Sequence, residues 1–169
     1  MGYARGNDWR KLNLMEIIPF EPQYALDFQL LNEAWLKKYF VVEPYDSELL
    51  SRREEVIIKP GGFIFFVKLE DQIIGTAAFI YKSKGIYELG KMAVKPSYQG
   101  NEIGQKLVRF MLSFAEKHHW SKIILYSSTL LKNALYIYQK YGFIEVPLEQ
   151  NLPYNRSDIK MELALKQMQ

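Results

Sequence analysis

The sequence predicts an α/β domain in which helices flank both faces of a mixed, largely antiparallel central sheet. Three apolar segments between residues 62 and 95 follow one another through short turns, as antiparallel neighbours do. Two segments with helical spacing of apolar residues precede them, and strand and helix patterns alternate afterwards. The resulting order, β-α-α-β-β-β-α-β-α-β-β, is typical of helices packed on a mixed sheet.

The first third of the chain is predicted to contain one strand and two helices. Residues 11–18 form a strand that Pro19 stops. An apolar stripe at helical spacing predicts a helix over residues 23–40. Asp46 or Ser47 can cap a second helix that continues through Lys59. The stripe of the first helix consists of Tyr24, Phe28, Leu31, Trp35 and Tyr39.

The remaining elements are predicted from apolar runs and turn residues. Residues 62–70 and 73–82 form a hairpin around Asp71-Gln72, and a third strand follows over residues 86–95. A helix with one apolar face begins at about Ile103. The later elements are an apolar strand over residues 122–128, a short helix over Asn133–Tyr141 closed by Gly142, and strands over residues 143–148 and 158–165.

Composition limits the domain organisation and the partners. The length of 169 residues fits one domain over residues 11–169, with residues 1–10 as a loose N-terminal tail. A formal net charge of +3, with basic residues scattered among acidic ones, does not indicate nucleic-acid binding. No apolar run approaches the ~20 residues of a membrane span, and a signal-peptide core is missing, so we expect a cytoplasmic protein without membrane contact. The chain has no cysteine, and its two histidines, His118 and His119, are adjacent and suit chelation poorly, so no metal site is expected.

The stretch AVKPSYQGNEIGQKLV, from Ala93 to Val108, joins the third strand of the hairpin region to the helix. The first N–H groups of a helix lack intrahelical partners and, with the helix dipole, can hold a phosphate group. Gly100 and Gly104 remove side chains where a ligand must approach the backbone closely. The alternative is a turn that uses glycine for its geometry alone.

Two motifs in this region resemble those of the GCN5-related N-acetyltransferase (GNAT) superfamily. The acyl-CoA loop of that family, [QR]-x-x-G-x-[GA], reads Gln99-Gly100-Asn101-Glu102-Ile103-Gly104 here. The second signature, an Asn, an Ala and a Tyr before Gly-Phe, reads Asn133-Ala134-Leu135-Tyr136-Ile137-Tyr138-Gln139-Lys140-Tyr141-Gly142-Phe143. The two motifs occur in the family's order, and the predicted elements of residues 11–165 match the GNAT fold.

The resemblance implies acetyl-CoA as cofactor. The strand before the loop would bind the pantetheine arm through its backbone, as though the arm were an extra strand. The loop would bind the pyrophosphate, and Asn133 the pantetheine from the other side, unless Asn133 is a helix N-cap, a role that it could also combine with binding. The implied cofactor-binding residues are Met92, Ala93, Val94, Gln99, Gly100, Asn101, Glu102, Ile103, Gly104, Gln105, Asn133 and Tyr138.

Glu102 departs from the family pattern, which has a glycine at this position. A carboxylate about 4 Å from the pyrophosphate would be repulsive by ~1 kcal/mol in water. We expect Glu102 to point outward from a helical backbone conformation, which glutamate tolerates well.

The resemblance also implies three catalytic groups. Met92 N–H would stabilise the thioester oxygen, Glu88 would be the base, and Tyr138 would protonate the leaving thiolate. The even spacing of Glu88 and Met92 places both side chains on one face unless a bulge at Gly90 resets the alternation. The alternatives are a solvated Glu88 on a half-exposed strand and a tyrosine that only packs.

The acceptor is expected to be a primary amine of a small molecule. The first two helices and the late loop line the acceptor side of this fold, which makes Tyr39, Glu43, Tyr154 and Arg156 candidate contacts. The alternative for each is a solvated surface residue. The other functions considered are acetylation of protein N-termini or lysines, non-catalytic acyl-CoA binding, and a purely structural module. The protein is expected to be a monomer or a homodimer.

Overall fold

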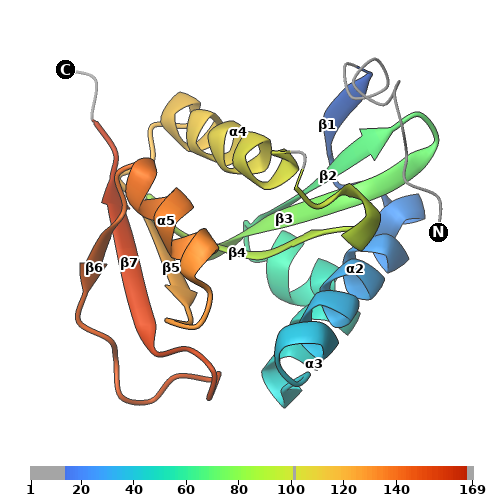
Figure 1. Cartoon of the computed structure of the whole chain (residues 1–169). Helices are drawn as coiled ribbons and strands as arrows, with labels where there is room; N and C mark the ends of the chain where they lie inside the picture. Colours follow the sequence, from blue (N-terminus) through green and yellow to red (C-terminus); the bar gives the residue numbers. More distant parts are fainter. Residues whose placement is uncertain (1–13, 101, 167–169) are drawn as a thin grey trace.

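The computed structural model describes residues 14–100 and 102–166 (Figure 1). The predicted tail, the beginning of the first strand and Asn101 lie outside the described residues. The strands are β1 (Met15–Pro19), β2 (Phe63–Leu69), β3 (Gln72–Ser83), β4 (Ile86–Val94), β5 (Lys122–Ser127), β6 (Ile144–Val146) and β7 (Ile159–Ala164). The helices are α2 (Ala25–Tyr39), α3 (Pro44–Ser51), α4 (Ile103–Lys117) and α5 (Lys132–Lys140), with 3-10 turns at Pro22–Tyr24 and Pro96–Tyr98 and a π-helical turn at Glu54–Ile58.

The predicted fold class is confirmed. The strands form one sheet in the order β1-β2-β3-β4-β5-β7-β6, and all neighbouring pairs in it are antiparallel except β4 and β5. The helix α4 makes the crossover that a parallel pair requires. Within the described part of the chain, no helix is long and apolar enough to cross a membrane.

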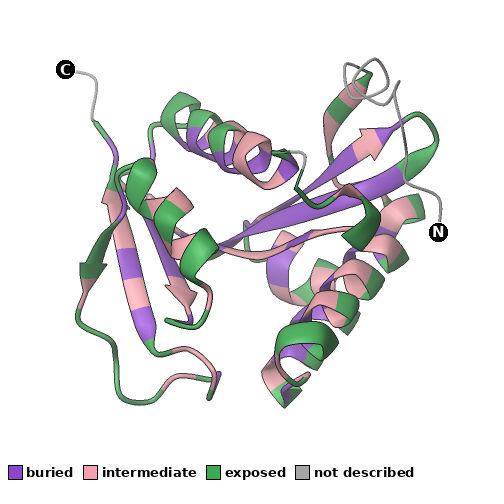
Figure 2. Cartoon of the chain, viewed as in Figure 1, coloured by how far each residue is buried: buried purple, intermediate pink, exposed green. Residues whose placement is uncertain are grey.

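The two faces of the sheet bury separate apolar clusters (Figure 2). Successive residues of β2 alternate between them: Phe65 packs on the side of α4 and α5, and Phe66 on the side of α2 and α3. The central strands β2 and β3 are buried along most of their length. This rigid centre holds β4, whose other edge forms the site described below.

Several element boundaries differ from the predicted ones. The second helix begins at Pro44, with Glu43 as N-cap, and it ends at Ser51 before the π-helical turn, so the predicted cap at Asp46 or Ser47 and the continuous helix to Lys59 are wrong. Proline suits the first position of a helix because its missing N–H would have no partner there. The Asp46 carboxylate instead accepts a hydrogen bond from Glu43 N–H at 2.9 Å.

Two smaller corrections concern turns. The hairpin between β2 and β3 turns at Glu70-Asp71, one residue earlier than predicted, and Glu70 adopts φ 55°. The helix α5 begins at Lys132 with Leu131 as N-cap, so Asn133 is in the first turn and is not the N-cap.

The strand β4 is fully paired on one side only. It pairs with β3 from Ile86 to Val94, but with β5 at three positions that end at Glu88↔Ile124. Beyond this point β4 and β5 separate, and among residues 14–100 and 102–166 no strand lies beside the backbone of β4 toward Val94 on that side. The separation opens the sheet between its two halves (Figure 1).

Candidate active site

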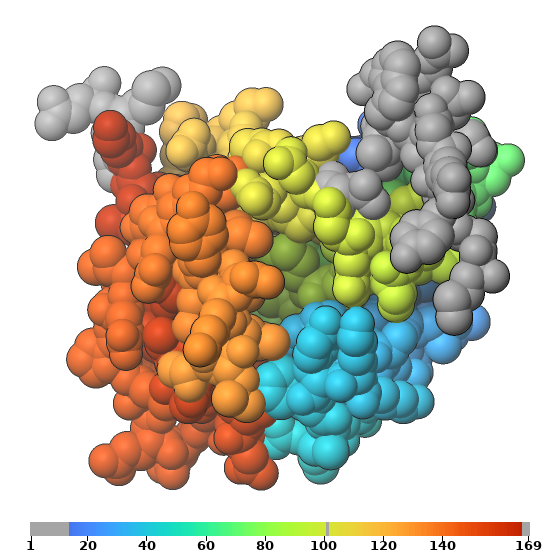
Figure 3. Space-filling model, in the orientation of Figure 1, coloured from blue at the N-terminus to red at the C-terminus, as the bar shows by residue number. Residues whose placement is uncertain are grey.

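A cleft of about 630 Å³ lies where β4 and β5 separate. In Figure 3 it is the hollow between the orange surface of α5 and the yellow-green and cyan surfaces opposite. Among the predicted site residues, Glu43 does not line the cleft but binds Arg156, which does, and Asn101 lies outside the described residues. The predicted residues that line it are Tyr39, Glu88, Met92, Ala93, Val94, Gln99, Gly100, Glu102, Ile103, Gly104, Gln105, Asn133, Tyr138, Tyr154 and Arg156.

One end of the cleft is formed by the loop after β4 and the first turn of α4. Gly100 has φ 84°, and a Cβ atom on Gly100 or on Gly104 would meet no atom of the described residues within 4 Å. A glycine in a helix costs about 1 kcal/mol relative to alanine, and the packing around Gly104 does not require it. Open space beside the first N–H groups of a helix fits an anionic ligand such as a pyrophosphate.

Glu102 is the N-cap of α4 and has φ 59° and ψ 16°, a left-handed conformation. The expected right-handed helical conformation of this residue is therefore wrong. The left-handed region costs a non-glycine residue about 1–2 kcal/mol, because its Cβ approaches the following carbonyl oxygen. The side chain is exposed, and the strain gives a physical reason for a glycine at the matching position of the family motif.

The two glutamines of the loop direct their side chains to the protein. Gln99 Nε2 donates to the carbonyl of Val94 at 3.1 Å and so ties the loop to the end of β4. Gln105 Oε1 accepts from Lys140 Nζ at 3.2 Å, a contact between α4 and α5. The Gln99 N–H also donates within the loop, to the Pro96 carbonyl at 3.3 Å.

The β4 wall of the cleft contains a bulge. Thr76 pairs with Ala93 and Ala78 with Gly90, so Lys91 and Met92 together face one residue of β3. The side chains of Met92 and Val94 pack on the α4 side of the sheet, whereas Glu88 is opposite Ile80, which belongs to the other cluster. A bulge at Gly90 was expected to be able to reverse the alternation of side chains between the two faces. The structure contains such a bulge one residue later, at Lys91 and Met92. Glu88 and Met92 therefore direct their side chains to opposite faces.

Glu88 is buried, with 7% of its surface exposed, so the expectation of a solvated glutamate on a half-exposed strand is wrong. Burial raises the pKa of its carboxyl group, although the charges of Lys82 and Lys91 oppose the shift. Lys82 Nζ lies 3.4 Å from Glu88 Oε1. A carboxylate with a raised pKa is a better proton acceptor than a free one, which suits a general base.

Tyr138 stands on the α5 wall of the cleft, with its ring 5.7 Å from that of Phe143 in an edge-to-face arrangement. Burial raises the pKa of its hydroxyl group to about 12. The phenol therefore stays protonated throughout the neutral range and can act as a proton donor. Its neighbour Tyr136 is 67% exposed.

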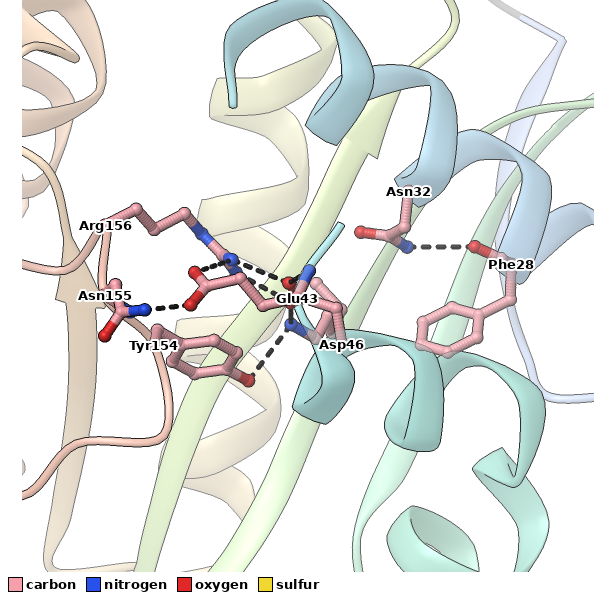
Figure 4. A network of polar contacts seen from close by, with 8 residues as sticks. Phe28, Asn32, Glu43, Asp46, Tyr154, Asn155 and Arg156 are labelled. Carbon is pink, nitrogen blue, oxygen red and sulfur yellow. Dashed lines mark hydrogen bonds and ion pairs between the residues drawn. The ribbon is translucent and has the colours of Figure 1, made fainter. Parts of the chain in front are cut away.

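The predicted acceptor contacts Glu43, Tyr154 and Arg156 belong to one buried polar network (Figure 4). Arg156 donates two hydrogen bonds of 2.7 Å to Asp46 and one of 3.0 Å to Glu43. Lys91 Nζ lies 2.8 Å from Asp46 Oδ1, so two cations and two carboxylates form a neutral cluster. These residues are not solvated surface residues, whereas Tyr39, 44% exposed, lies at the rim of the cleft.

The hydrogen bonds of the cluster determine its charge state. Burial alone would raise the pKa of the Asp46 carboxyl, but the hydrogen bonds from Arg156 and the charge of Lys91 outweigh it and hold that pKa below its ordinary value. Burial raises the pKa of the Tyr154 hydroxyl far above its ordinary value, which keeps this phenol neutral.

Lys91 was not among the predicted site residues, and Asp46 was predicted only as a helix cap. The available signal was Gly90 beside Lys91 in the strand IYELGKMAV, since a glycine inside a strand often marks a bulge. The sequence predicted Tyr39 as an acceptor contact but not the aromatic wall around it at the end of α2, where the Trp35 ring lies 5.4 Å from that of Tyr39 and 5.7 Å from that of Phe40.

The fold and the cleft define an α/β protein with a helix N-terminus and an unpaired strand edge at one site, the arrangement expected of an acyl-CoA-binding acetyltransferase. The chain belongs to the acetyltransferase (GNAT) family, whose model matches residues 28–143. The suspected family is thus confirmed. The site residues inferred from its motifs remain predictions.

Curated relatives of known name match part of the chain. N-acetylaspartate synthetase of Xenopus tropicalis is 32% identical over 99 residues, which are 57% of this chain and 36% of that protein. The N-acetyltransferase YjgM of Escherichia coli, itself uncharacterized, is 27% identical over 110 residues, 63% of this chain and 64% of that protein. The chain spans about a third of the length of the N-acetylaspartate synthetases that it matches.

Solved structures share the fold at low sequence identity. An acetyltransferase of the GNAT family from Staphylococcus aureus has a TM-score of 0.78 and 21% identity, with 90% of this chain and 99% of that chain covered. Spermidine N-acetyltransferase from Vibrio cholerae, in complex with CoA and spermine, has a TM-score of 0.67 and 18% identity, with 90% and 96% covered.

The burial of Glu88 predicts the pH dependence of stability. Its pKa is raised on folding, so between the unfolded value near 4.3 and the folded value the unfolded chain loses a proton that the folded protein keeps. This group therefore makes the folded state less stable as pH rises through that window. Glu88→Gln, which stays neutral, should gain in free energy of unfolding relative to wild type between about pH 4 and about pH 8. Denaturant unfolding at both pH values checks this.

Glu145→Gln, on the exposed face of β6, is the control for loss of a surface carboxylate. A difference between Glu88→Gln and wild type that does not change with pH would mean that Lys82 and Lys91 fully offset the burial of Glu88.

Proposed function

We propose that the protein transfers the acetyl group of acetyl-CoA directly to a primary amine of a small molecule. The observation that carries this proposal is the divergence of β4 from β5, which opens a cleft with an anion-binding helix terminus at one end. Glu88 and Tyr138 stand on opposite walls of the same cleft. Membership of the GNAT family supports an acyltransferase of this kind.

Acetyl-CoA would bind along the unpaired edge of β4 and across the N-terminus of α4. The N–H groups of the first turn of α4 would hold the pyrophosphate, with Gly100 and Gly104 allowing close approach. The backbone of Met92–Val94 would bind the pantetheine arm in the manner of an added strand. Asn133, in the first turn of α5, lines the opposite wall.

The transfer needs three groups around the thioester. The amine nitrogen attacks the thioester carbon, the carbon–sulfur bond breaks, and the amine proton leaves while the thiolate gains one. Glu88 would accept the amine proton, directly or through water, and Met92 N–H would donate to the thioester oxygen. Tyr138 would protonate the sulfur.

The burial of Tyr138 makes its hydroxyl group a weaker proton donor. A phenol with a pKa of about 12 is a weaker acid than a free thiol near 8.5, a difference of about 5 kcal/mol. The thiolate would form in the same half-buried cleft, where loss of hydration raises its pKa as well and reduces this difference.

The acceptor end of the cleft supports a small amine. The aromatic wall of α2 offers contact for an apolar body, and the buried Glu88 offers a partner for an ammonium group. Arg156 and Lys91 are already paired with Asp46, which leaves them less able to bind an acceptor carboxylate. The names of the relatives suggest aspartate and spermidine as the first amines to test.

Calorimetric titration with acetyl-CoA, CoA and ATP, followed by thiol release with a panel of amines, tests the proposal. We expect micromolar binding of both CoA species, no binding of ATP, and thiol release with at least one small amine. Thiol release only with peptides that carry a free N-terminus or lysine would show that the acceptor is a protein and not a small amine. Binding without release from any acceptor would indicate a non-catalytic acyl-CoA binder.

Substitution of Gly104 should change stability and binding in opposite directions. Gly104→Ala favours the helix by about 0.5–1 kcal/mol, because alanine loses less conformational freedom on folding. Its methyl group would stand where the pyrophosphate must approach, at a cost of about 1–3 kcal/mol, or roughly tenfold in the dissociation constant of acetyl-CoA. Thermal unfolding and calorimetry measure the two effects.

Ser113→Ala is the matched control, because Ser113 is exposed in the same helix and does not line the cleft. It should stabilise the protein and leave acetyl-CoA binding unchanged. Unchanged binding in Gly104→Ala would remove Gly104 from the cofactor site.

Removal of the Tyr138 hydroxyl should affect turnover and not binding. Tyr138→Phe is expected to lower kcat about 100-fold, since the thiolate loses its proton donor, with little change in the affinity for acetyl-CoA. Steady-state kinetics of thiol release and calorimetry separate the two. Tyr136→Phe, an exposed tyrosine of the same helix, is the control, and a kcat equal to wild type in Tyr138→Phe would exclude Tyr138 from the mechanism.

A further inference from the structure

The bulge in β4 is strained at Lys91. This residue has φ 51°, a left-handed value at a non-glycine residue, and a single such residue costs about 1–2 kcal/mol. It lies three positions after the last pair between β4 and β5, at Glu88, and directly before Met92–Val94, which do not pair with β5. The strained residue therefore directly precedes Met92–Val94, the residues proposed to bind the pantetheine arm.

The Lys91 side chain leaves the sheet toward α3 and ends in the buried polar cluster. Its Nζ atom lies 2.8 Å from Asp46 Oδ1 and 3.0 Å from the Tyr154 hydroxyl, and 4.5 Å from the centre of the Tyr154 ring. The Lys91 side chain is 7% exposed and that of Asp46 is fully buried.

Asp46 is itself held from two other directions. Its carboxylate accepts the Glu43 N–H at the start of α3 and both terminal nitrogens of Arg156, which comes from the segment before β7 (Figure 4). A carboxylate fixed by α3 and by this segment is a rigid partner. The path of the bulge is thus tied to two parts of the chain outside the sheet.

We infer that the Lys91–Asp46 ion pair holds Lys91 in its left-handed conformation and so positions the backbone of Met92–Val94 for the cofactor. A glycine at position 91 would adopt this conformation without strain and would not need the ion pair. At the lysine, the ion pair offsets the strain. Buried ion pairs contribute little net stability but can select one backbone arrangement over others, which is the role inferred here. Lys91 and Asp46 are positioning residues, and the inference rests on the proposed acetyl-CoA site.

Two substitutions at position 91 separate the ion pair from the strain. Lys91→Met keeps the Cβ atom and most of the side-chain volume but removes the charge, so the left-handed conformation loses its support. It should weaken acetyl-CoA binding about tenfold, as expected from the strain of one such residue. Lys91→Gly removes the strain together with the attachment, and should recover most of that loss.

The control is Lys122→Met, which removes a more exposed ion pair between two strands of the sheet. Lys122 Nζ lies 3.3 Å from Glu162 Oε2, between β5 and β7 and away from the bulge. This variant should bind acetyl-CoA as wild type does.

Amide hydrogen exchange without ligand provides a readout that does not depend on the proposed function. The amides around Met92–Val94 on the β3 side, those of Ala93 and of Lys95, which donates to the Ile74 carbonyl at 2.7 Å, should exchange faster in Lys91→Met and not in Lys122→Met. If wild type fails to bind acetyl-CoA, the proposed function fails, while the exchange data still test the ion pair.

Three results would overturn the inference. The first is binding and exchange in Lys91→Met that equal those of wild type. The second is a Lys91→Gly variant that does not recover affinity for acetyl-CoA. The third is a change in Lys91→Met of only the KM for the amine, which would make Lys91 an acceptor contact. If Lys91→Met does not fold but Lys91→Gly does, the ion pair supports the strained conformation as inferred. If neither folds, the role is global stability and not positioning.

Discussion

The strand β4 pairs along its whole length with β3 but only at its beginning with β5, and the rest of the site depends on this asymmetry. An unpaired strand edge inside a protein normally costs free energy, because each buried N–H and C=O group needs a partner. Here the unpaired edge lines a cleft, where a ligand or water can satisfy it. The buried strands β2 and β3 hold β4 rigidly from the other side.

Two left-handed residues border this edge. Lys91 introduces the bulge before Met92–Val94, and Glu102 begins α4 after the loop. Backbone strain at non-glycine residues persists where the surrounding structure over-determines it, and it is concentrated at functional sites. At Lys91 the buried ion pair with Asp46 provides that support. The two strained positions lie at the two ends of the segment that the proposed cofactor would contact.

The charges of the cleft are arranged in two groups. Asp46, Glu43, Arg156 and Lys91 neutralise one another and connect α3, β4 and the segment before β7. Glu88 is outside this set of short ion pairs and has a longer contact, of 3.4 Å, with Lys82, and burial raises the pKa of its carboxyl group. The cleft therefore combines a structural network with one carboxylate that is suited to proton transfer.

The sequence by itself determined the fold class, the order of the elements and the family. The fold class and the order follow from local signals, since apolar periodicity and turn residues act over a few positions. The family follows from the resemblance of two motifs, Gln99–Gly104 and Asn133–Phe143. The sequence also indicated most of the residues that line the cleft, because the two motifs lie on segments that the sheet brings together. It placed the cap of α3 wrongly, since Pro44 can begin a helix as well as interrupt one.

Only the tertiary structure decided the burial of Glu88, the left-handed conformation of Glu102, and the pairing of Lys91 with Asp46 across 45 positions of the chain. Burial and ion pairing depend on which segments meet in space, and a backbone conformation at a bulge depends on what holds its side chain. The spacing of residues along the chain therefore cannot predict the burial of Glu88, the conformation of Glu102 or the partner of Lys91.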